Sequence, residues 1–88
     1  MSLESRKKNL LKAGNAILRN RPDTVKTLLR EHIRETMGFE RLSLETQLPL
    51  ARLKRMFAPK GELRARELFA SFVALQRDAG IKIHLAAE

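Results

Sequence analysis

The side chains with the clearest chemistry in this 88-residue chain are arginines and lysines, which gather in two blocks. Residues 1–22 hold six basic side chains and one acid, and residues 49–66 hold the same numbers. Residues 23–48 and 67–88 each carry a net charge of −1, so the total of +8 comes from the two blocks. Positive charge clustered in this way favours a polyanion partner over an evenly solvated basic surface.

Three basic residues of the second block are expected on the side of a helix that faces away from the core. Leu53 and Met56 are spaced to face a core. A helical rotation of about 100° per residue then places Arg52, Lys54 and Arg55 on the outside. Arginine and lysine on such a face either read guanine edges or hold phosphates, and the sequence leaves both roles open for each residue.

The candidate DNA-binding residues begin in the first turn of the helix that contains Leu53 and Met56, and they continue into the segment that follows this helix. Free N–H groups in a first turn suit a phosphate, and small apolar side chains there suit thymine methyl groups. Basic residues beyond the loop suit contacts to the DNA backbone. The set comprises Pro49, Leu50, Ala51, Arg52, Lys54, Arg55, Lys60 and Arg64. Arg66 follows the same loop and also suits a backbone contact.

Residue types suited to catalysis or metal binding are scattered. His32 and His84 lie far apart in the sequence, and the chain has no Cys and no glycine-rich phosphate loop. Glu31 and Glu35 are spaced as a solvated helix face. We therefore expect no enzymatic activity, no cofactor and no metal. His32 falls on an apolar stripe and is expected at the edge of a core, with a satisfied hydrogen bond.

No stretch approaches the length of a membrane span, and the N-terminus lacks the apolar segment of a signal peptide. The absence of Cys is compatible with a reducing compartment. We expect a cytoplasmic protein with no membrane partner.

Residues 39–57 must position the basic side chains, and they are predicted to form two short helices. Gln47, Leu48 and Pro49 make the joint between them, because proline suits the start of a helix. Ser43 leaves room for the second helix to approach. This is the layout of a helix-turn-helix, whose second helix enters the DNA major groove. The predicted small core between the two helices comprises Leu42, Leu48, Leu53 and Met56.

Three further helices are predicted around this pair, over residues 3–20, 23–37 and 63–79. Asp23 is the expected N-cap of the second, and Gly38 and Gly80 are expected to end the second and third. The first has a basic polar face and an apolar face of Leu3, Leu10, Leu11, Gly14, Ile17 and Leu18. The third has an apolar face of Leu68, Phe69, Phe72, Val73, Leu75, Gln76 and Ala79.

These helices divide the chain into an N-terminal basic amphipathic helix, residues 1–22, and a helix-turn-helix domain, residues 23–88. The basic helix is expected to dock as an ordinary surface helix, in preference to lying on a membrane or on DNA phosphates. Phe57, Phe69 and Phe72 are expected to pack together in the core.

The C-terminal residues Ile81, Lys82, Ile83, His84 and Leu85 alternate strictly between apolar and polar, which predicts one β-strand. A single strand leaves its backbone groups unpaired. Its simplest partner is the same strand of a second copy, paired antiparallel about a two-fold axis. The alternatives are a strand of another protein and a short disordered end. We therefore expect a homodimer.

Several runs resemble one known family: Met37 to Leu42, Pro59-Lys60-Gly61, and Ala65 to Phe69. Over residues 24–85 the chain resembles the helix-turn-helix antidote-type (antitoxin-like) regulators of bacterial toxin–antitoxin modules, in the broad Cro/repressor (XRE) class. The resemblance implies a dimer that binds operator DNA through Pro49 to Arg55 with Lys60 beyond, and in many members a small toxin partner.

In this family pattern, glycine usually stands in the turn where this chain has Gln47. Gln47 must therefore take a positive φ at some cost, or the turn must differ.

The sequence thus predicts a mainly α, lambda-repressor-like five-helix domain with one C-terminal strand. Its expected function is sequence-specific binding of double-stranded DNA as a dimeric, antitoxin-like transcriptional regulator. The alternative is a protein-interaction module that neutralises a toxin and has little specific affinity for DNA. An RNA-binding protein is the third possibility, favoured only by the charge, because exposed aromatic residues for base stacking are lacking.

Overall fold

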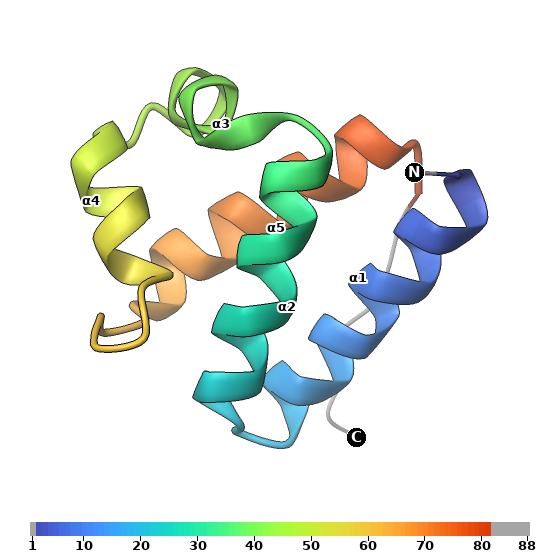
Figure 1. Cartoon of the computed structure of the whole chain (residues 1–88), viewed down its shortest axis with the longest axis horizontal. Coiled ribbons are helices and arrows are strands. Elements are labelled where there is room, and N and C mark those ends of the chain that lie inside the picture. The colour runs from blue at the N-terminus through green and yellow to red at the C-terminus, as the bar shows by residue number, and fades with distance from the viewer. Residues whose placement is uncertain (1, 82–88) are drawn as a thin grey trace.

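The computed structural model describes residues 2–81, and this part of the chain is mainly helical. Figure 1 shows α5 crossing behind α2, with α1 on one side of α2 and the short helices α3 and α4 on the other. The described residues contain no β-strand. The helices are α1 (Leu3–Leu18), α2 (Pro22–Glu35), α3 (Gly38–Thr46), α4 (Leu50–Met56) and α5 (Ala65–Ala79).

Local residues mark several of the helix ends. The Ser2 side chain accepts a hydrogen bond from the Ser5 N–H at 3.1 Å, which satisfies one free donor at the start of α1. Gly80 ends α5 with φ of 69°, as predicted.

The prediction that Gly38 ends α2 was wrong, because α2 ends at Glu35 and Gly38 is the first residue of α3. The prediction that Asp23 caps α2 was wrong. The helix begins one residue earlier, at Pro22, because proline fits a first helical position, and Asp23 lies inside the first turn.

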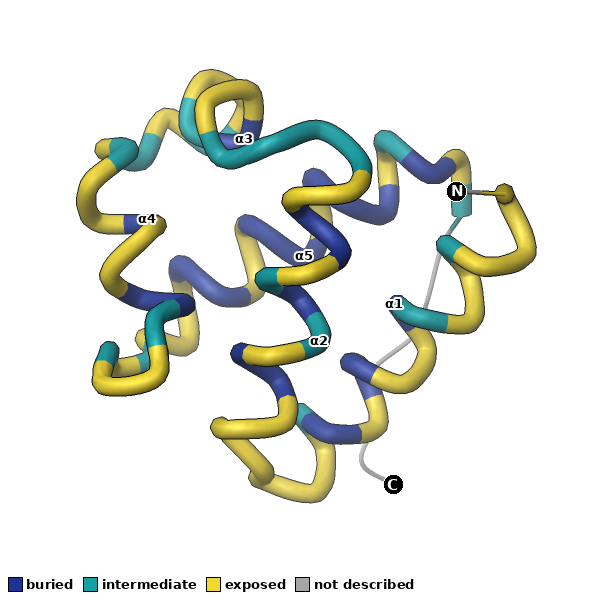
Figure 2. Tube along the Cα trace, viewed as in Figure 1, coloured by how far each residue is buried: buried dark blue, intermediate teal, exposed yellow. Residues whose placement is uncertain are grey.

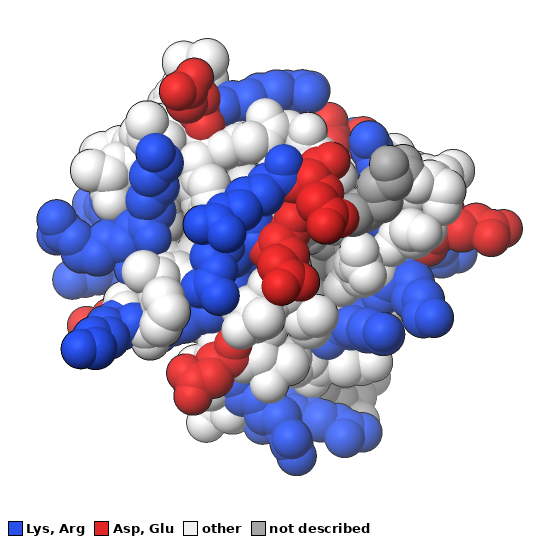
Figure 3. Space-filling model, viewed as in Figure 1, with Lys and Arg blue, Asp and Glu red and all other residues white. Residues whose placement is uncertain are grey.

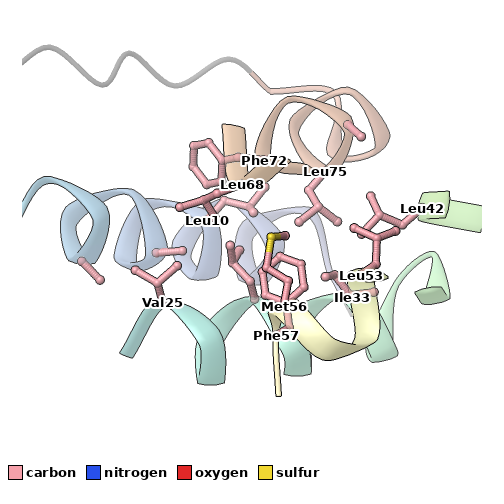
Figure 4. Packing of buried hydrophobic residues seen from close by; sticks show 14 of the residues in the cluster. Leu10, Val25, Ile33, Leu42, Leu53, Met56, Phe57, Leu68, Phe72 and Leu75 are labelled. Atoms are coloured by element: carbon pink, nitrogen blue, oxygen red, sulfur yellow. The ribbon is translucent and has the colours of Figure 1, made fainter. Parts of the chain in front are cut away.

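All five helices contribute to one hydrophobic core. Figure 4 shows Leu10 of α1, Ile33 of α2 and Leu42 of α3 directed into the same interior as side chains from α4 and α5. Burial of a leucine or isoleucine of this kind stabilises a fold by roughly 2 kcal/mol. The largest fully buried side chains are Phe57, Phe72, Leu10, Leu29, Ile33, Leu42, Leu53 and Leu75. The core therefore extends from the N-terminal helix to α5.

The expected grouping of three phenylalanines was wrong. Phe57 and Phe72 are buried, but Phe69 is 43% exposed. Phe57 instead packs against the ring of Phe39, with 6.1 Å between ring centroids. Phe39 stands at the start of α3, so this aromatic pair ties α3 to the end of α4.

Several residues predicted on apolar faces lie on the surface, as the exposed segments of α1 and α5 in Figure 2 indicate. Val73 is 44% exposed, like its neighbour Phe69 one turn earlier on α5. The predicted stripes were wider than the area that neighbouring helices cover, so residues at the edge of each stripe meet solvent. On α1 these edge residues are Leu3, Leu11 and Leu18.

His32 is more deeply buried than the sequence predicts. Its side chain is only 2% exposed, and neither ring nitrogen has a hydrogen-bond partner, so the expected satisfied hydrogen bond was wrong. Nearby, Asp78 of α5 pairs with Arg41 at 3.2 Å and Arg6 at 3.6 Å. Burial, and after it the Arg6 guanidinium, hold the pKa of His32 below its ordinary 6.5. Asp78 and Glu35 oppose this shift.

The predicted C-terminal strand, residues 81–85, lies outside the described residues except for Ile81. Ile81 itself follows the α5 cap, and its N–H donates to the Gln76 carbonyl at 3.0 Å. It packs against the core as a half-buried side chain. The strand and the dimer that it implies therefore stay predictions.

Candidate nucleic-acid interface

Three residues, Gln47 to Pro49, connect α3 to α4 and set the angle between them. Gln47 adopts the left-handed conformation, with φ of 59° and ψ of 28°. This is the conformation that glycine usually adopts in the turn of the family pattern described above. The Ser43 hydroxyl donates to the Leu48 carbonyl at 2.5 Å and holds the turn against α3. Pro49 then sets φ to −58° at the residue before α4.

The helix α4 has one face in the core and one in solvent. Leu53 is fully buried and Met56 is 3% exposed. On the opposite face Arg52, Lys54 and Arg55 are exposed, as predicted from the helical repeat. The exposed face also carries Ala51, whereas Leu50 is half-buried and Pro49, just before the helix, is exposed.

Two basic residues of α2 fix the end of α4 and the loop that follows. The Arg30 Nη1 donates to the Phe57 carbonyl at 2.9 Å, where α4 ends. The buried Lys26 ammonium donates to the Gly61 carbonyl and, at 3.4 Å, to the Pro59 carbonyl. The Phe57 carbonyl lies at the end of α4, and the Pro59 and Gly61 carbonyls lie in the loop that follows, so these bonds connect both parts to α2.

The loop also depends on the lack of a side chain at Gly61. The Gly61 N–H donates to the Ala58 carbonyl at 2.9 Å, which makes a tight turn. A Cβ at this position would overlap the Arg55 carbonyl oxygen, so the loop folds back directly onto the last turn of α4.

An ion pair ties one of the basic residues of α4 to α5. The Arg52 Nη2 lies 2.7 Å from the Glu67 Oε1, and the Glu67 side chain is 10% exposed. This carboxylate limits how freely Arg52 reaches a ligand. By contrast, no ion pair within residues 2–81 engages Lys54, Arg55, Lys60 or Arg64.

The structure divides the predicted basic residues between the two sides of α4. Arg52, Arg55 and Arg64 line a cleft of about 170 Å³ with Met56, Glu62 and Glu67. Lys54 faces a different and larger cleft on the α2 side. Lys60 is exposed in the loop between α4 and α5. The exposed face of α4 therefore has cations along both edges.

Figure 3 shows this distribution on the face seen in Figure 1. Lys and Arg side chains gather over α4 and its loop, and a second group lies over α2 beside acidic side chains. The α1 helix, which carries the first basic block, lies across α2 from α4 (Figure 1). The two basic blocks of the sequence therefore stand on different sides of the molecule.

Sequence reasoning missed Arg30 and Arg34 of α2, which line the same cleft as Lys54. They stand four residues apart on the polar side of a predicted helix, which is a usual position for solvated charges. Nothing in the local sequence places that side next to α4. Glu67 was missed for the same reason, since its pairing with Arg52 depends on how α5 crosses α4.

Within residues 2–81 no three side chains of His, Asp or Glu come together in a way that could hold a metal ion. None of the described helices combines the length and the apolar character needed to cross a bilayer.

Comparisons of the chain with protein-family models, with curated proteins and with solved structures find no match. The function is therefore inferred from the geometry and charge of the site.

Proposed function

We propose that the chain is a DNA-binding transcriptional regulator in which α3, the turn and α4 act as a helix-turn-helix. The observation that carries this proposal is the two-sided character of α4: Leu53 and Met56 anchor it in the core, and Arg52, Lys54 and Arg55 lie exposed. A short helix packed into the core along one side, with cations on the other, suits insertion into the major groove.

In this proposal the exposed residues divide into two roles. Ala51 and Arg55 lie near the middle of the exposed face and are the candidates for contact with base edges. Lys54 along one edge, Arg64 along the other and Lys60 in the loop after α4 are the candidates for contact with DNA phosphates. Arg52 takes part to the extent that DNA competes with Glu67 for its guanidinium.

Two copies would place two such helices on one DNA duplex. A dimer reads two half-sites about one helical turn, roughly 34 Å, apart. The homodimer and the role of residues 81–85 in it are part of the proposal. The narrower assignment, an antitoxin-like regulator with a small toxin partner, stays a prediction from the resemblance of residues 24–85.

The test is selection of binding sites from a random duplex library, followed by affinity measurements across a range of salt concentrations. We expect a palindromic consensus whose affinity exceeds that for random duplex by at least about a thousandfold. An Arg52→Glu, Arg55→Glu double variant should lose this preference. A Lys8→Glu, Lys12→Glu variant on α1 makes the same charge change away from α4 and should retain the consensus.

Two results would contradict the proposal. If the α4 double variant selected the same consensus with unchanged affinity, α4 would not be the recognition helix. If the unmodified protein bound DNA and RNA duplexes equally, with steep salt dependence and no consensus, the positive charge would be acting without sequence recognition.

A further inference from the structure

A cleft of about 770 Å³ lies between α2, α3 and α4. Apolar side chains form much of its lining: Met37, Phe39 and Ala58 are half-buried, and Pro59 stands exposed at the rim. This volume is in the range of roughly 300–1,000 Å³ that ligand-binding clefts occupy. The half-buried residues would lose further contact with water if a ligand covered them.

Three cations surround this apolar lining: Arg30, Arg34 and Lys54. Arg30 is held in place because its Nη1 donates to the Phe57 carbonyl at 2.9 Å. No ion pair within residues 2–81 neutralises any of the three, although Glu40 lines the same cleft. The cleft thus combines an apolar surface with positive charge that lacks a carboxylate partner.

The cations come from two helices on different sides of the hollow. In Figure 3, basic side chains over α2 and over α4 flank an uncharged strip. Arg30 and Arg34 belong to α2, whereas Lys54 belongs to α4. A ligand with a single negative group would reach one side only. A chain with several negative groups along its length would reach both.

We infer that this cleft binds a protein partner through an acidic peptide segment that carries a large apolar side chain. The apolar side chain would cover Met37, Phe39 and Pro59, and carboxylates on either side of it would meet the cations of α2 and α4. Charge complementarity selects this class of ligand. A DNA duplex supplies the negative charge, but its bases are stacked inside the helix and would leave the apolar lining uncovered.

One consequence rests on the proposed DNA-binding function. Lys54 belongs both to the cleft and to the exposed face of α4, so a peptide in the cleft and DNA on α4 would compete for it. The partner would then release the protein from DNA. Peptide binding itself does not depend on this and is measured without DNA.

The experiment is selection of short random peptides displayed on yeast, with the full-length protein as the target and no DNA present. We expect the enriched peptides to place two or more acidic residues beside a large apolar residue. Replacing that apolar residue by serine should weaken binding at least about tenfold. An Arg34→Glu, Lys54→Glu double variant should also bind at least about tenfold more weakly. Both substituted residues are exposed, so the variant should keep its helical circular dichroism.

The Lys8→Glu, Lys12→Glu variant is the matched control, since both lysines lie exposed on α1. It should bind the selected peptides with unchanged affinity. In NMR spectra of the unmodified protein, peptide addition should shift the amide signals of Gly38 and Phe39. The inference is overturned if no peptide is enriched, if enriched peptides lack acidic residues, or if the cleft variant and the α1 variant bind them equally well. DNA binding can fail in its own assay without affecting any of these results.

Discussion

At the candidate site, Gln47 has a strained backbone conformation. It is a non-glycine residue with φ of 59°, at the turn that orients α4. Side chains with a Cβ are disfavoured in this conformation by about 1–2 kcal/mol. The Ser43 hydrogen bond to Leu48 and the burial of Leu53 hold the turn in place despite this cost.

Replacing this residue by glycine should therefore stabilise the protein. We expect Gln47→Gly to raise the free energy of unfolding by about 1 kcal/mol, because the gain in the turn exceeds the greater flexibility of glycine in the unfolded chain. Urea denaturation followed by circular dichroism measures the change. Gln47→Ala is the control and should give no comparable gain, since alanine keeps the Cβ. A glycine variant less stable than the alanine variant would contradict this account.

His32 is buried without a hydrogen-bond partner, which makes the stability of the fold depend on pH. Its pKa is lowered in the folded state by burial and by Arg6, so the unfolded chain binds the proton more readily. The stabilising effect of a neutral His32 is complete above its ordinary pKa of 6.5 and is lost as the pH falls below that value. The loss stops once the pH is below the lowered pKa of the folded state.

We expect the free energy of unfolding to fall between pH 7.5 and pH 5.5, and to fall less in a His32→Leu variant. The comparison removes effects of other titrating groups, including His84, because both proteins contain them. At pH 7.5 the substitution should cost less than about 1 kcal/mol, since no hydrogen bond is lost. Equal pH dependence in the two proteins would show that His32 is not the responsible group.

Glu67 controls how far Arg52 is available on the surface of α4. The 2.7 Å ion pair keeps a carboxylate next to the proposed DNA-binding face. Glu67→Gln should increase affinity for a random DNA duplex by a few-fold, because Arg52 is released and a negative charge is removed. Glu4→Gln makes the same charge change at an exposed position on α1 and should leave the affinity nearly unchanged. An equal effect of both substitutions would show that net charge alone matters.

At the scale of the helices, α4 is positioned by contacts at both of its ends. The turn from Gln47 to Pro49 sets its start, and the loop held by Lys26 and Arg30 sets its end. A helix of seven residues has little stability of its own in water. Its orientation therefore depends on these two connections and on the burial of Leu53 and Met56.

Gly61 is the position at which the second connection is easiest to break. We expect Gly61→Ala to destabilise the protein by about 2 kcal/mol, because the added Cβ meets the Arg55 backbone carbonyl, which cannot move without unwinding α4. Gly38→Ala is the matched control. Gly38 has φ of 79° but open space around it, so alanine there adds only backbone strain. Thermal denaturation should rank Gly61→Ala as the less stable of the two, and the reverse order would contradict this account of the loop.

At the scale of the whole molecule, size limits how one copy can bind DNA. The described residues measure 31 × 26 × 18 Å, close to the roughly 34 Å of one DNA turn. In the proposed complex with DNA, one copy would therefore cover about one half-site, and a palindromic operator would require two. The alternating residues 81–85 supply the predicted contact between copies.

Removal of residues 82–88 should separate the predicted dimer while leaving α5 intact. Truncation after Ile81 keeps the Gly80 cap and the Ile81 hydrogen bond to Gln76. We expect sedimentation velocity to report the monomer mass for the truncated protein and twice that mass for the full chain. The circular dichroism of the helices should be unchanged. A full chain that sediments as a monomer, or a truncated chain that remains a dimer, would contradict the predicted strand pairing.

Features that depend on residues a few positions apart could be predicted from the amino-acid sequence. The helical repeat of Leu53 and Met56 predicted which side of α4 is exposed, because side-chain direction follows from rotation along one helix. Gly80 marked the end of α5 for the same local reason. Pro49 and its neighbours likewise indicated a joint between two short helices.

Features that depend on how helices cross could not be predicted in this way and became visible in the folded structure. Arg52 pairs with Glu67, and Arg30 and Arg34 approach α4, although these residues are distant in the sequence. Phe69 is exposed because the neighbouring helices do not extend far enough to cover it. An amphipathic sequence pattern indicates that one side of a helix is apolar. The pattern does not indicate how much of that side the neighbouring helices cover, or which charged residues of two helices come close together. Both depend on how the whole chain packs.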